Sequence, residues 1–325
     1  MNFSFFKKKS VNTLHTVAFY NLENLFDAID DPDTLDDDFT PNGSRKWTPR
    51  RYQRKLGKLA KTIGEIGLEA VGLPPVLVGV AEVENETVVQ DLLATEPLNK
   101  YNYQYVHYDS PDEGGGIDNA LLYNKDNFEV ISSEAIPLIV YSLAGQRDTT
   151  RDILYVHGIL NGEEVHIFVN HWPSRRNGEV ETDYKRIAAA KTINEYMGHI
   201  EEGTENPNYI VMGDFNDGPS STSIQTLMSR NKLHNPMETL RSPNRGSANY
   251  RKSWSLFDQI MVSHNFLNYE KGTHSFCDAN IFDETFLREF KGKYKGSPHR
   301  TYVGRRYMGG FSDHFPVYVQ FKYNS

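Results

Sequence analysis

The chain has 325 residues, of which 38% are hydrophobic, and this is enough to build a large core in one big domain or two ordinary ones. A net charge of −8 excludes a global positive field that would recruit nucleic acid, and the ordinary hydrophobic and aromatic content excludes a disordered chain. The single cysteine, Cys277, excludes an intrachain disulfide, and no apolar run is long enough to span a bilayer.

The N-terminal stretch MNFSFFKKKSVNT does not have the order of a signal peptide, because its lysines follow the short apolar piece instead of preceding it. We therefore predict a ragged segment over residues 1–13 and a single domain over residues 14–325. The expected location is the cytoplasm, with secretion left open if an upstream signal was removed.

Strand-like and helix-like runs then alternate along the chain. The run HTVAFYNLENLF at 15–26 begins with a strand, and the apolar residues between 54 and 66 have helical spacing. The near-continuous apolar run PPVLVGVAEVEN at 74–85 predicts a strand that is buried on both faces. The following stretch at 85–96, NETVVQDLLATE, predicts a helix.

The middle of the chain carries the clearest local pattern. Residues 117–130 predict a strand, a turn and a second strand. At 151–172 two alternating runs are joined by Asn161-Gly162, a dipeptide that favours the tight turn of a β-hairpin. The stretch at 182–197 predicts a helix capped by Thr182 or Asp183. Further strands are predicted at YIVMGDF (209–215), SLFDQIMVS (255–263) and HFPVYVQF (314–321).

This element order argues against a purely parallel, doubly wound sheet, since it contains many strands and a definite antiparallel hairpin. A mixed α/β sandwich of two sheets with helices outside fits better. No internal repeat or low-complexity linker divides the chain. The polar segments 27–50 and 240–253 are predicted to be long loops, and long loops in a compact domain are often functional.

Polar side chains stand repeatedly where these apolar runs end. Ligand sites of α/β folds gather at strand ends, so one shared site explains the whole set. Each residue also has a structural alternative: Asp214 and Asn216 suit an Asx turn, and His171 suits a satisfied core histidine. The set comprises Asn21, Glu23, Glu82, Glu84, Asn170, His171, Asp214, Asn216, Asp258, Asp313 and His314.

The residue types in this set narrow the chemistry. Oxygen ligands from Asp, Glu and Asn suit Mg²⁺ or Mn²⁺, whereas no Cys or His pair has the spacing typical of structural zinc. Histidines beside carboxylates suit acid–base work and the stabilisation of negative charge. Together with nearby arginines they predict metal-assisted hydrolysis of a phosphate ester.

Six motifs resemble the endonuclease/exonuclease/phosphatase superfamily, which includes the pancreatic-type DNases. They are AFYNLENLF, GVAEVEN, GIDNALLY, VNHWPSR, GDFND and GFSDHFPV, and they stand in the order found in that superfamily. The resemblance extends from about Thr16 to Phe321. It implies a catalytic domain with a four-layered α/β sandwich and two central mixed β-sheets, in agreement with the pattern of elements.

The resemblance also implies roles for the residues around a cation. Asn21 and Glu82 resemble the metal-binding pair, and Asp313 resembles a carboxylate on the metal side. Glu23 stands where some members carry an acidic residue for a second metal. One or two Mg²⁺ or Mn²⁺ ions are therefore expected.

A second set of roles concerns the attacking water and the phosphate. Asp214 and Asn216 resemble the residues that position or deprotonate the water. Asp258 and His314 resemble an Asp-His pair in which the carboxylate orients and charges the imidazole. His171 resembles the histidine that stabilises the transition state. Substrate binding is expected from Asn170, Arg175 and Arg176.

The substrate is predicted less sharply than the chemistry. Basic runs at 45–61 and 288–306 favour a nuclease acting on DNA or RNA, since phosphate contacts provide most non-specific affinity for nucleic acid. The alternative is a phosphatase for small molecules, inositols or lipid headgroups, and a non-catalytic binding module is the least favoured. We expect a monomer without a membrane anchor. The aromatic residues among these runs have two interpretations, stacking on bases or packing in the core or on the surface, and the second is favoured at least equally. They are Trp47, Tyr52, Tyr294, Tyr302 and Tyr307.

The Asp-rich run at 27–38 is interpreted as a solvated loop. A Ca²⁺ site was the alternative, but the run lacks the glycine and the terminal glutamate of an EF-hand loop.

Overall fold

A computed structural model describes residues 13–325 except residues 33, 111–115, 143–144, 149 and 177. The predicted ragged segment 1–13 therefore lies outside the described residues, apart from its last residue.

The first of two six-stranded sheets joins both ends of the chain, with the strand order β15-β18-β1-β2-β4-β3. It is a mixed sheet, because β1 runs parallel to β2 and antiparallel to β18. Its strands are β1 Leu14–Leu25, β2 Leu77–Val83, β3 Tyr103–His107, β4 Asp118–Asn124, β15 His274–Ile281 and β18 Val317–Tyr323.

The second sheet has the order β11-β14-β10-β9-β8-β5 and is also mixed, since β9 and β10 are parallel. Its strands are β5 Phe128–Ile136, β8 Ile153–Leu160, β9 Glu163–His171, β10 Tyr209–Asp214, β11 Leu233–His234 and β14 Asp258–Ser263. Short two-stranded ribbons lie outside the sheets: β6 Val140–Tyr141 with β7 Arg147–Asp148, β12 Ala248–Tyr250 with β13 Ser253–Ser255, and β16 Tyr302–Val303 with β17 Arg306–Tyr307.

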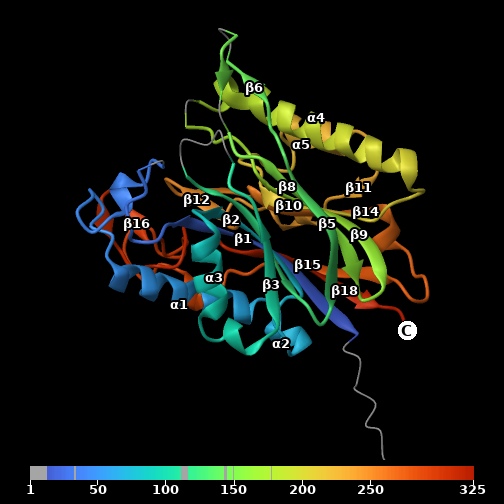
Figure 1. Ribbon diagram of the computed structural model, residues 1–325, viewed down its shortest axis with the longest axis horizontal. Helices are drawn as coiled ribbons and strands as arrows, with labels where there is room; N and C mark the ends of the chain where they lie inside the picture. The colour runs from blue at the N-terminus through green and yellow to red at the C-terminus, as the bar shows by residue number, and fades with distance from the viewer. Residues whose placement is uncertain (1–12, 33, 111–115, 143–144, 149, 177) are drawn as a thin grey trace, which may run out of the picture.

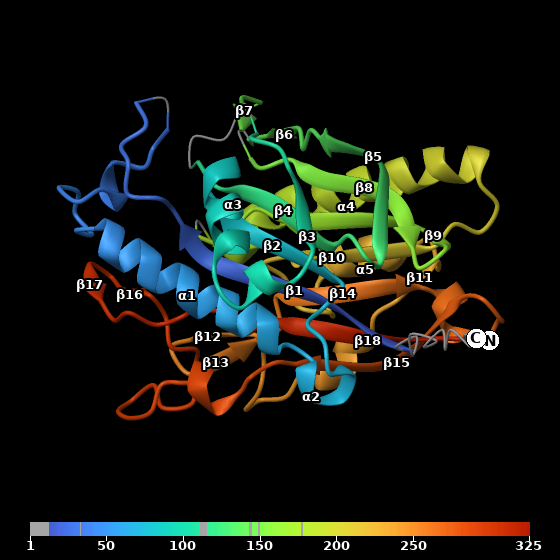
Figure 2. The same ribbon diagram turned by 60° about the horizontal axis from the view of Figure 1, so that its bottom comes forward.

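Helices cover the outer face of each sheet, which produces four layers (Figures 1 and 2). On the first sheet lie α1 Pro49–Glu65, α2 Leu68–Val71 and α3 Glu86–Ala94, and on the second lie α4 Glu179–Gly203 and α5 Thr222–Met228. Short 3₁₀ helices are η1 Asp37–Phe39, η2 Leu98–Lys100, η3 Pro236–Leu240, η4 His264–Leu267 and η5 Thr285–Leu287. Within the described part of the chain, no helix has both the length and the apolar character needed to cross a membrane.

Two buried clusters hold the layers together. The larger one joins α1 and α3 to the first sheet and continues between the inner faces of the two sheets. The smaller one packs α4 and α5 against the outer face of the second sheet through residues such as Phe168 and Ile193. The predicted sandwich of two mixed sheets with helices outside is therefore confirmed.

Most of the predicted elements form, with two corrections. The hairpin at 151–172 is β8 and β9, and its turn residues Asn161 and Gly162 have φ values of 48° and 94°. The predicted cap of α4 at Thr182 or Asp183 is wrong, because the helix begins at Glu179 and Thr182 donates its hydroxyl to Gly178 within the first turn. The strands predicted at 117–130 exist, but β4 and β5 belong to different sheets.

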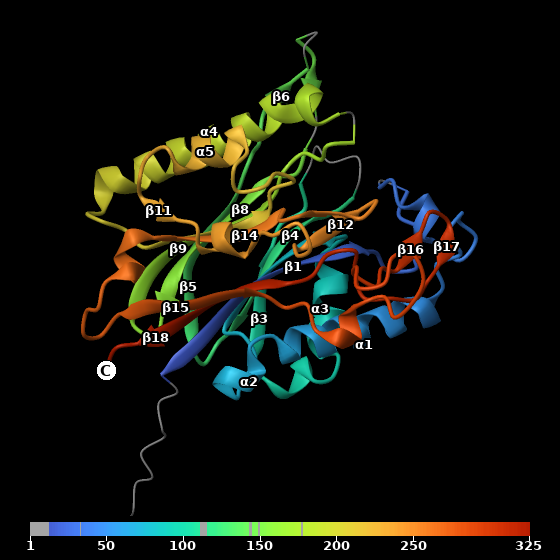
Figure 3. The ribbon, with the colours of Figure 1, turned by 180° about the vertical axis from the view of Figure 1, so that it is seen from behind.

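Segments from opposite ends of the chain meet beside α1. The loop between β1 and α1 lies next to the ribbon of β16 and β17 (Figure 3). Tyr302 donates its hydroxyl to the carbonyl of Arg45 at 3.0 Å, and Arg45 donates to the carbonyl of Gly304 at 3.0 Å. Trp47 packs on Tyr302 with their ring centroids 6.0 Å apart. The two loops therefore support each other.

This packing decides between the two interpretations of three aromatic residues. Trp47, Tyr52 and Tyr302 are 0%, 5% and 5% exposed, so they pack in the core and are not available for stacking on nucleic-acid bases. Tyr307 is half-buried beneath Arg51, and Tyr294 is exposed. The Asp-rich run is largely solvated, as expected, except for the buried Asp36.

Candidate functional site

Three neighbouring strands of the second sheet place polar side chains in one row. In the register of the sheet, Asp214 on β10 lies beside His171 on β9 and beside Asp258 on β14. β14 runs antiparallel to β10, so its first residue meets the last residue of β10 at the same edge. The strong apolar runs that precede His171 and Asp214 bury these strands and bring their polar ends into the protein.

A glycine lets β9 and β10 approach each other next to this row. A Cβ atom at Gly213 would lie 2.4 Å from the carbonyl oxygen of Asn170, so no other residue fits there without displacing the strand. The glycine therefore positions Asp214 one residue further along.

The first sheet contributes Glu82, which faces the polar row of the second sheet as the opposite wall of the site. Glu82 lies where the pairing of β1 with β2 and of β2 with β4 shifts register, and it has a positive φ of 63°. A bulge of this kind aims a side chain away from the normal alternation of the strand. It directs Glu82 to the edge of the sheet, where Asn24 donates its backbone N–H to Oε2 at 2.7 Å.

Asn21 joins the two walls. Its Nδ2 atom donates to Oε1 of Glu82 and to Oδ2 of Asp214, each at 3.0 Å. Its amide oxygen accepts the N–H of Glu23 at 2.9 Å. Asn21 is completely buried, so this bridge holds two carboxylates of different sheets close together.

Asp214 and Asn216 form the Asx turn that the sequence suggested, and Asp214 also lies beside two histidines. The N–H of Asn216 donates to Oδ1 of Asp214 at 2.9 Å, which is an Asx turn, and Asn216 has a positive φ of 50°. The turn leaves Oδ2 of Asp214 facing the two histidines. Burial, together with the charge of Asp258, raises the pKa of Asp214 to about 7, although His314 and two hydrogen bonds oppose this shift.

His314 and Asp258 form the predicted pair. Nδ1 of His314 lies 2.7 Å from Oδ2 of Asp258, and Nε2 lies 3.8 Å from Oδ2 of Asp214. Burial disfavours the imidazolium, but the carboxylates of Asp258, Asp214 and Asp313 outweigh it and raise the pKa of His314 well above its usual value. His314 is therefore positively charged at neutral pH.

His171 differs from His314 in its charge, because its imidazole is neutral at neutral pH. Its Nε2 atom lies 3.9 Å from Glu82 and 3.9 Å from Asp214. Burial, reinforced by the charges of Arg151 and His314, lowers the pKa of His171 well below its usual value. Its Nδ1 atom is buried and has no hydrogen-bond partner among the residues that the structure describes, so a core histidine with satisfied nitrogens is not what is seen here.

Asp313 lies at the other side of His314, with 4.0 Å between Oδ1 and Nε2. It pairs with Arg300, a residue that the sequence analysis did not single out. Burial would raise the pKa of Asp313, but His314 and Arg300 outweigh it and lower that pKa. Asp313 therefore remains a carboxylate.

Glu23, which the sequence analysis assigned to the site, makes its contacts with the C-terminal loop instead. The carboxylate of Glu23 accepts the backbone N–H groups of Thr301 and Tyr302 at 2.6 and 3.3 Å, and it receives Lys55 as a buried neighbour. Burial and Asp313 raise the pKa of Glu23 to about 7. Glu23 thus anchors the C-terminal loop.

Asn170 and Arg175 are likewise occupied by structural contacts. Asn170 is 0% exposed, donates to the carbonyls of Phe168 and Met212, and accepts from the indole of Trp172. Arg175 donates to the carbonyl of Asn216 at 2.6 Å and pairs with Asp217 and Glu179 at 2.5 and 2.7 Å. These contacts hold the Asx turn in place and leave no free donor on the Asn170 amide.

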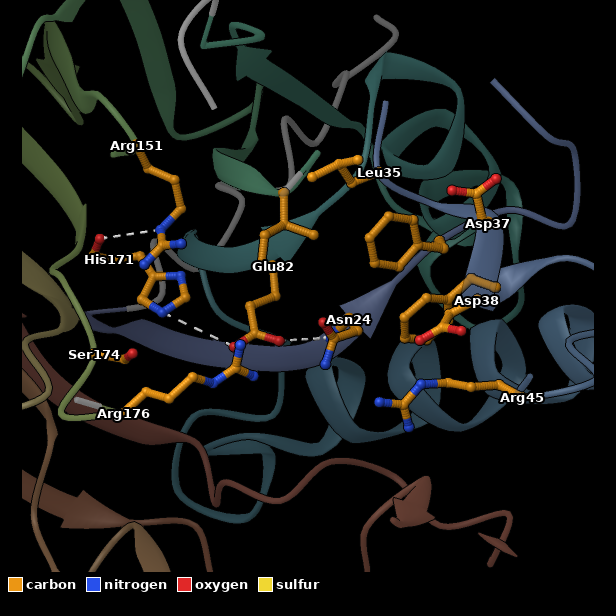
Figure 4. A pocket seen from close by; sticks show the side chains of 13 residues that line it. Asn24, Leu35, Asp37, Asp38, Arg45, Glu82, Arg151, His171, Ser174 and Arg176 are labelled. Carbon is orange, nitrogen blue, oxygen red and sulfur yellow. Dashed lines mark hydrogen bonds and ion pairs between the residues drawn. The ribbon is translucent and has the colours of Figure 1, made fainter. Parts of the chain in front are cut away.

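A cavity of about 600 Å³ opens beside Glu82 and His171 (Figure 4). Three arginines, Arg45, Arg151 and Arg176, line it together with Asp37, Asp38, Leu35 and Phe39. Of the arginines, only Arg176 was singled out as a binding residue from the sequence. Arg45 belongs to a basic run, but Arg151 precedes a strand as an ordinary charged residue and gave no signal.

A second cavity of about 190 Å³ lies on the far side of Asp313. It is lined by Arg251, Arg300 and the exposed rings of Tyr250 and Tyr294. Glu82 and His171 thus line the arginine-lined cavity, whereas Asp313 lines the smaller, more aromatic one.

The donor set fits a hard divalent cation. Glu82 and Asp214 accept the same side-chain amide of Asn21 at 3.0 Å each, and Asp214, Asp258 and His314 place potential ligand atoms within 4.8 Å of one another. Oxygen-rich surroundings of this kind suit Mg²⁺ or Mn²⁺. Asn21 fixes the two carboxylates through its amide nitrogen, while its oxygen accepts one hydrogen bond, from the N–H of Glu23.

Solved structures with the same fold are numerous, although their sequences are distant. A mannosyl-6-phosphatase from Bacteroides thetaiotaomicron is 20% identical with a TM-score of 0.57, and the match covers 95% of this chain and 100% of that chain. The human Nocturnin catalytic domain with bound sulfate is 16% identical with a TM-score of 0.58 and coverages of 97% and 96%. Humanized TDP2 from D. rerio is 15% identical with a TM-score of 0.55 and coverages of 95% and 99%.

No curated protein matches the chain in sequence. At the identities above, the solved structures establish the fold alone. A sequence model of the Endonuclease/Exonuclease/phosphatase family, however, matches residues 16–323, which is nearly the whole chain. The protein belongs to the endonuclease/exonuclease/phosphatase family of phosphoesterases.

Proposed function

We propose that the protein is a metal-dependent phosphoesterase that hydrolyses a small phosphate ester held in the arginine-lined cavity. The observation that carries the proposal is the position of Arg45, Arg151 and Arg176 around a cavity that opens on Glu82 and His171. Guanidinium groups bind phosphate and carboxylate groups in a bidentate manner, so they favour a compact anionic substrate.

In the proposed mechanism, Asp214 is the general base that accepts a proton from the attacking water. With its pKa at about 7, this carboxylate is able to accept a proton from an attacking water near neutral pH. Asn216 fixes Asp214 through the Asx turn, and Arg175 fixes the carbonyl of Asn216. Asp214 is therefore held by its neighbours in one orientation.

The two histidines have different tasks because they have different charges. His314, kept protonated by Asp258, provides a positive charge and an N–H donor for a phosphoryl oxygen. His171 is neutral, and its Nε2 faces the same space from the opposite strand. A phosphoryl group between them meets donors on two sides.

A divalent cation, Mg²⁺ or Mn²⁺, would be held by Glu82 with Asp214 or Asp313, and when bound it supplies Lewis-acid stabilisation of negative charge on the phosphoryl group. Within the chain, Asn21 keeps Glu82 and Asp214 at the separation that such binding needs.

A nuclease is the second candidate. The observation that favours it is the second cavity, where the exposed rings of Tyr250 and Tyr294 stand beside Arg251 and Arg300. A chain with several phosphates extends to both sides of the catalytic row, and exposed aromatic rings stack on bases. The burial of Trp47, Tyr52 and Tyr302 removes the other aromatic support for this alternative.

A paired hydrolysis assay with Mg²⁺ or Mn²⁺ separates the two candidates. One arm contains small phosphomonoesters and phosphodiesters, and the other contains supercoiled plasmid and single-stranded DNA. We expect turnover of small esters that falls by about 10³-fold in Asp214→Asn, a typical loss for a general base. Asp278→Asn, at an exposed position of β15, is the matched control and retains full activity.

Nicking of plasmid by the wild type, without turnover of small esters, would replace the proposal by the nuclease. Wild-type activity in Asp214→Asn would contradict the mechanism in either case. Circular dichroism of both variants verifies that the fold is intact.

A further inference from the structure

A second group of metal-binding residue types lies on the hairpin of β8 and β9, away from the catalytic row. His157, Glu164 and His166 each offer one ligand atom, and these atoms all lie within 4.8 Å of one another. Nε2 of His157 is 2.7 Å from Oε1 of Glu164. The sequence analysis predicted no zinc-type site, because it considered the spacing of ligands along the chain and not across a hairpin.

The register of the hairpin creates this group. His157 and His166 are directly opposite each other. The N–H of His166 donates to the carbonyl of Asn208 at 2.8 Å, which directs it away from β8, so the two histidines form a non-hydrogen-bonded pair. Side chains approach most closely in such pairs. Their imidazole rings are accordingly stacked at 4.5 Å with an angle of 8° between them.

The two ring nitrogens of His166 have different surroundings. Its Nδ1 atom lies 2.7 Å from the hydroxyl of Tyr155. Its Nε2 atom has no hydrogen-bond partner among the described residues. This nitrogen is buried, because His166 is only 4% exposed. A buried nitrogen without a partner is costly, and a bound ligand would satisfy it.

The partner at Nδ1 prepares His166 for a metal. Metal-binding histidines usually hold their second nitrogen by a hydrogen bond, which fixes the tautomer and the direction of the ring. Burial, together with the charge of His157, lowers the pKa of His166 to about 4, so the imidazole is neutral at pH 7. Neutral imidazole is the form that binds metal ions.

This group is distinct from the catalytic row. His166 and His171 are on the same strand, β9, but five residues apart, which corresponds to roughly 17 Å along a strand. An odd separation also places their side chains on opposite faces of the sheet. His166 faces the layer of α4, where Tyr155 contacts Tyr196 with their ring centroids 4.7 Å apart.

We propose that His157, Glu164 and His166 form a binding site for a transition-metal cation of the Zn²⁺ type, which ties β8 to β9 beneath the C-terminal part of α4. Two imidazoles and one carboxylate suit Zn²⁺ better than Mg²⁺ or Ca²⁺, which prefer oxygen ligands. On binding, the cation takes the place of the hydrogen bond between Nε2 of His157 and Glu164, and the neutral imidazole carries its one N–H on Nδ1. Water completes the coordination.

The experiment titrates the full-length chain with Zn²⁺ alone by isothermal calorimetry, in a Glu82→Gln background that weakens the catalytic cation site. We expect one Zn²⁺ per chain and a rise in melting temperature with Zn²⁺, because a ligand that binds the native state stabilises it. Adding His157→Ala or Glu164→Gln, at partly exposed positions, should weaken Zn²⁺ binding at least about tenfold. Both variants leave the buried His166 unchanged, so we expect them to fold.

His199→Ala is the matched control. His199 also lies beside a glutamate, Glu202 at 3.8 Å, but both side chains are more than three-quarters exposed on α4. Zn²⁺ binding should not change in this variant. Absence of Zn²⁺ binding in the Glu82→Gln chain, or equal binding in the His157→Ala and His199→Ala variants, would overturn the proposal.

Discussion

The floor and the rim of the candidate site are built in different ways. The floor, formed by Asn21, Glu82, His171, Asp214 and Asp258, consists of side chains at strand ends, and four of these five belong to the buried polar residues of the protein. The rim, formed by Leu35, Asp37, Asp38, Arg45 and Arg176, comes from loops, and its Leu35 is 70% exposed. The polar side chains of the rim are exposed or half-buried, and Arg45 still donates to the carbonyl of Gly304 at 3.0 Å.

This difference separates the chemistry from the choice of substrate. On the floor, the backbone register of two sheets holds the polar groups together. Burial lowers the pKa of His171, whereas neighbouring carboxylates raise the pKa of His314. On the rim, arginines from distant segments meet around a space that loops define. Substitutions on the floor should therefore affect turnover, and those on the rim should affect substrate binding.

The largest effect is expected at Glu82. Glu82→Gln removes a negative charge from the floor while preserving the size of the side chain. We expect cation affinity to fall and kcat to decrease by at least about 10³-fold, since charge stabilisation by a metal is worth several kcal/mol. Calorimetric titration with Mn²⁺ and initial rates measure the two quantities. Glu129→Gln, at an exposed position of β5, is the control, and equal rates in the two variants would remove Glu82 from the site.

A smaller loss of turnover is expected at Asp258. Asp258→Asn removes the charge that keeps the pKa of His314 high, so the imidazolium form, present below that pKa, should be lost at a lower pH than in the wild type. We expect kcat to fall by about 10²-fold, with a further decline above about pH 6.5, the ordinary value of histidine. The profile of kcat against pH tests this, and a parallel profile in both proteins would contradict it.

On the rim, Arg45→Ala and Arg176→Ala should act on binding. We expect KM to rise by about tenfold, equivalent to about 1.4 kcal/mol, while kcat changes by less than about twofold. Steady-state kinetics on the best small ester separates the two parameters. Lys271→Ala, an exposed cation of the loop before β15, is the control for net charge. A loss of kcat without a change in KM would erase the distinction between rim and floor.

The smallest effect concerns the stability of the rim. Glu84 accepts the N–H of Asp27 at 2.7 Å, and burial, aided by Asp27, Asp36 and Asp31, raises the pKa of Glu84 from 4.5 to about 8. The folded protein therefore holds this proton more tightly than the unfolded chain, and the associated stability, complete below pH 4.5, is lost as pH rises to about 8.

Glu84→Gln keeps the side chain neutral at every pH. In buffer that contains a chelator, the melting temperature of the variant should be a few degrees above that of the wild type at about pH 8. The difference should shrink as the pH falls towards the unperturbed pKa of glutamate. Differential scanning fluorimetry across this range is sufficient. A difference that is independent of pH would show that the proton on Glu84 does not matter.

The sequence by itself determined the parts of this protein that depend on short-range pattern. Alternating and continuous apolar runs predicted the main strands, Asn161-Gly162 predicted the hairpin, and polar residues at strand ends predicted the floor. These predictions succeed because a strand that is buried on one face has alternating apolar residues, and a strand that is buried on both faces has a continuous apolar run. The family motifs added which of these polar residues belong together.

Only the tertiary structure decided which polar side chains are free to act. Glu23, Asn170 and Arg175 stand in the same motifs as the floor residues, yet long-range contacts engage them in holding loops and strands. Long-range packing also brought Arg45 and Arg151 to one cavity. The charge states of His171 and His314 likewise follow from burial and neighbouring charges, which no stretch of sequence contains.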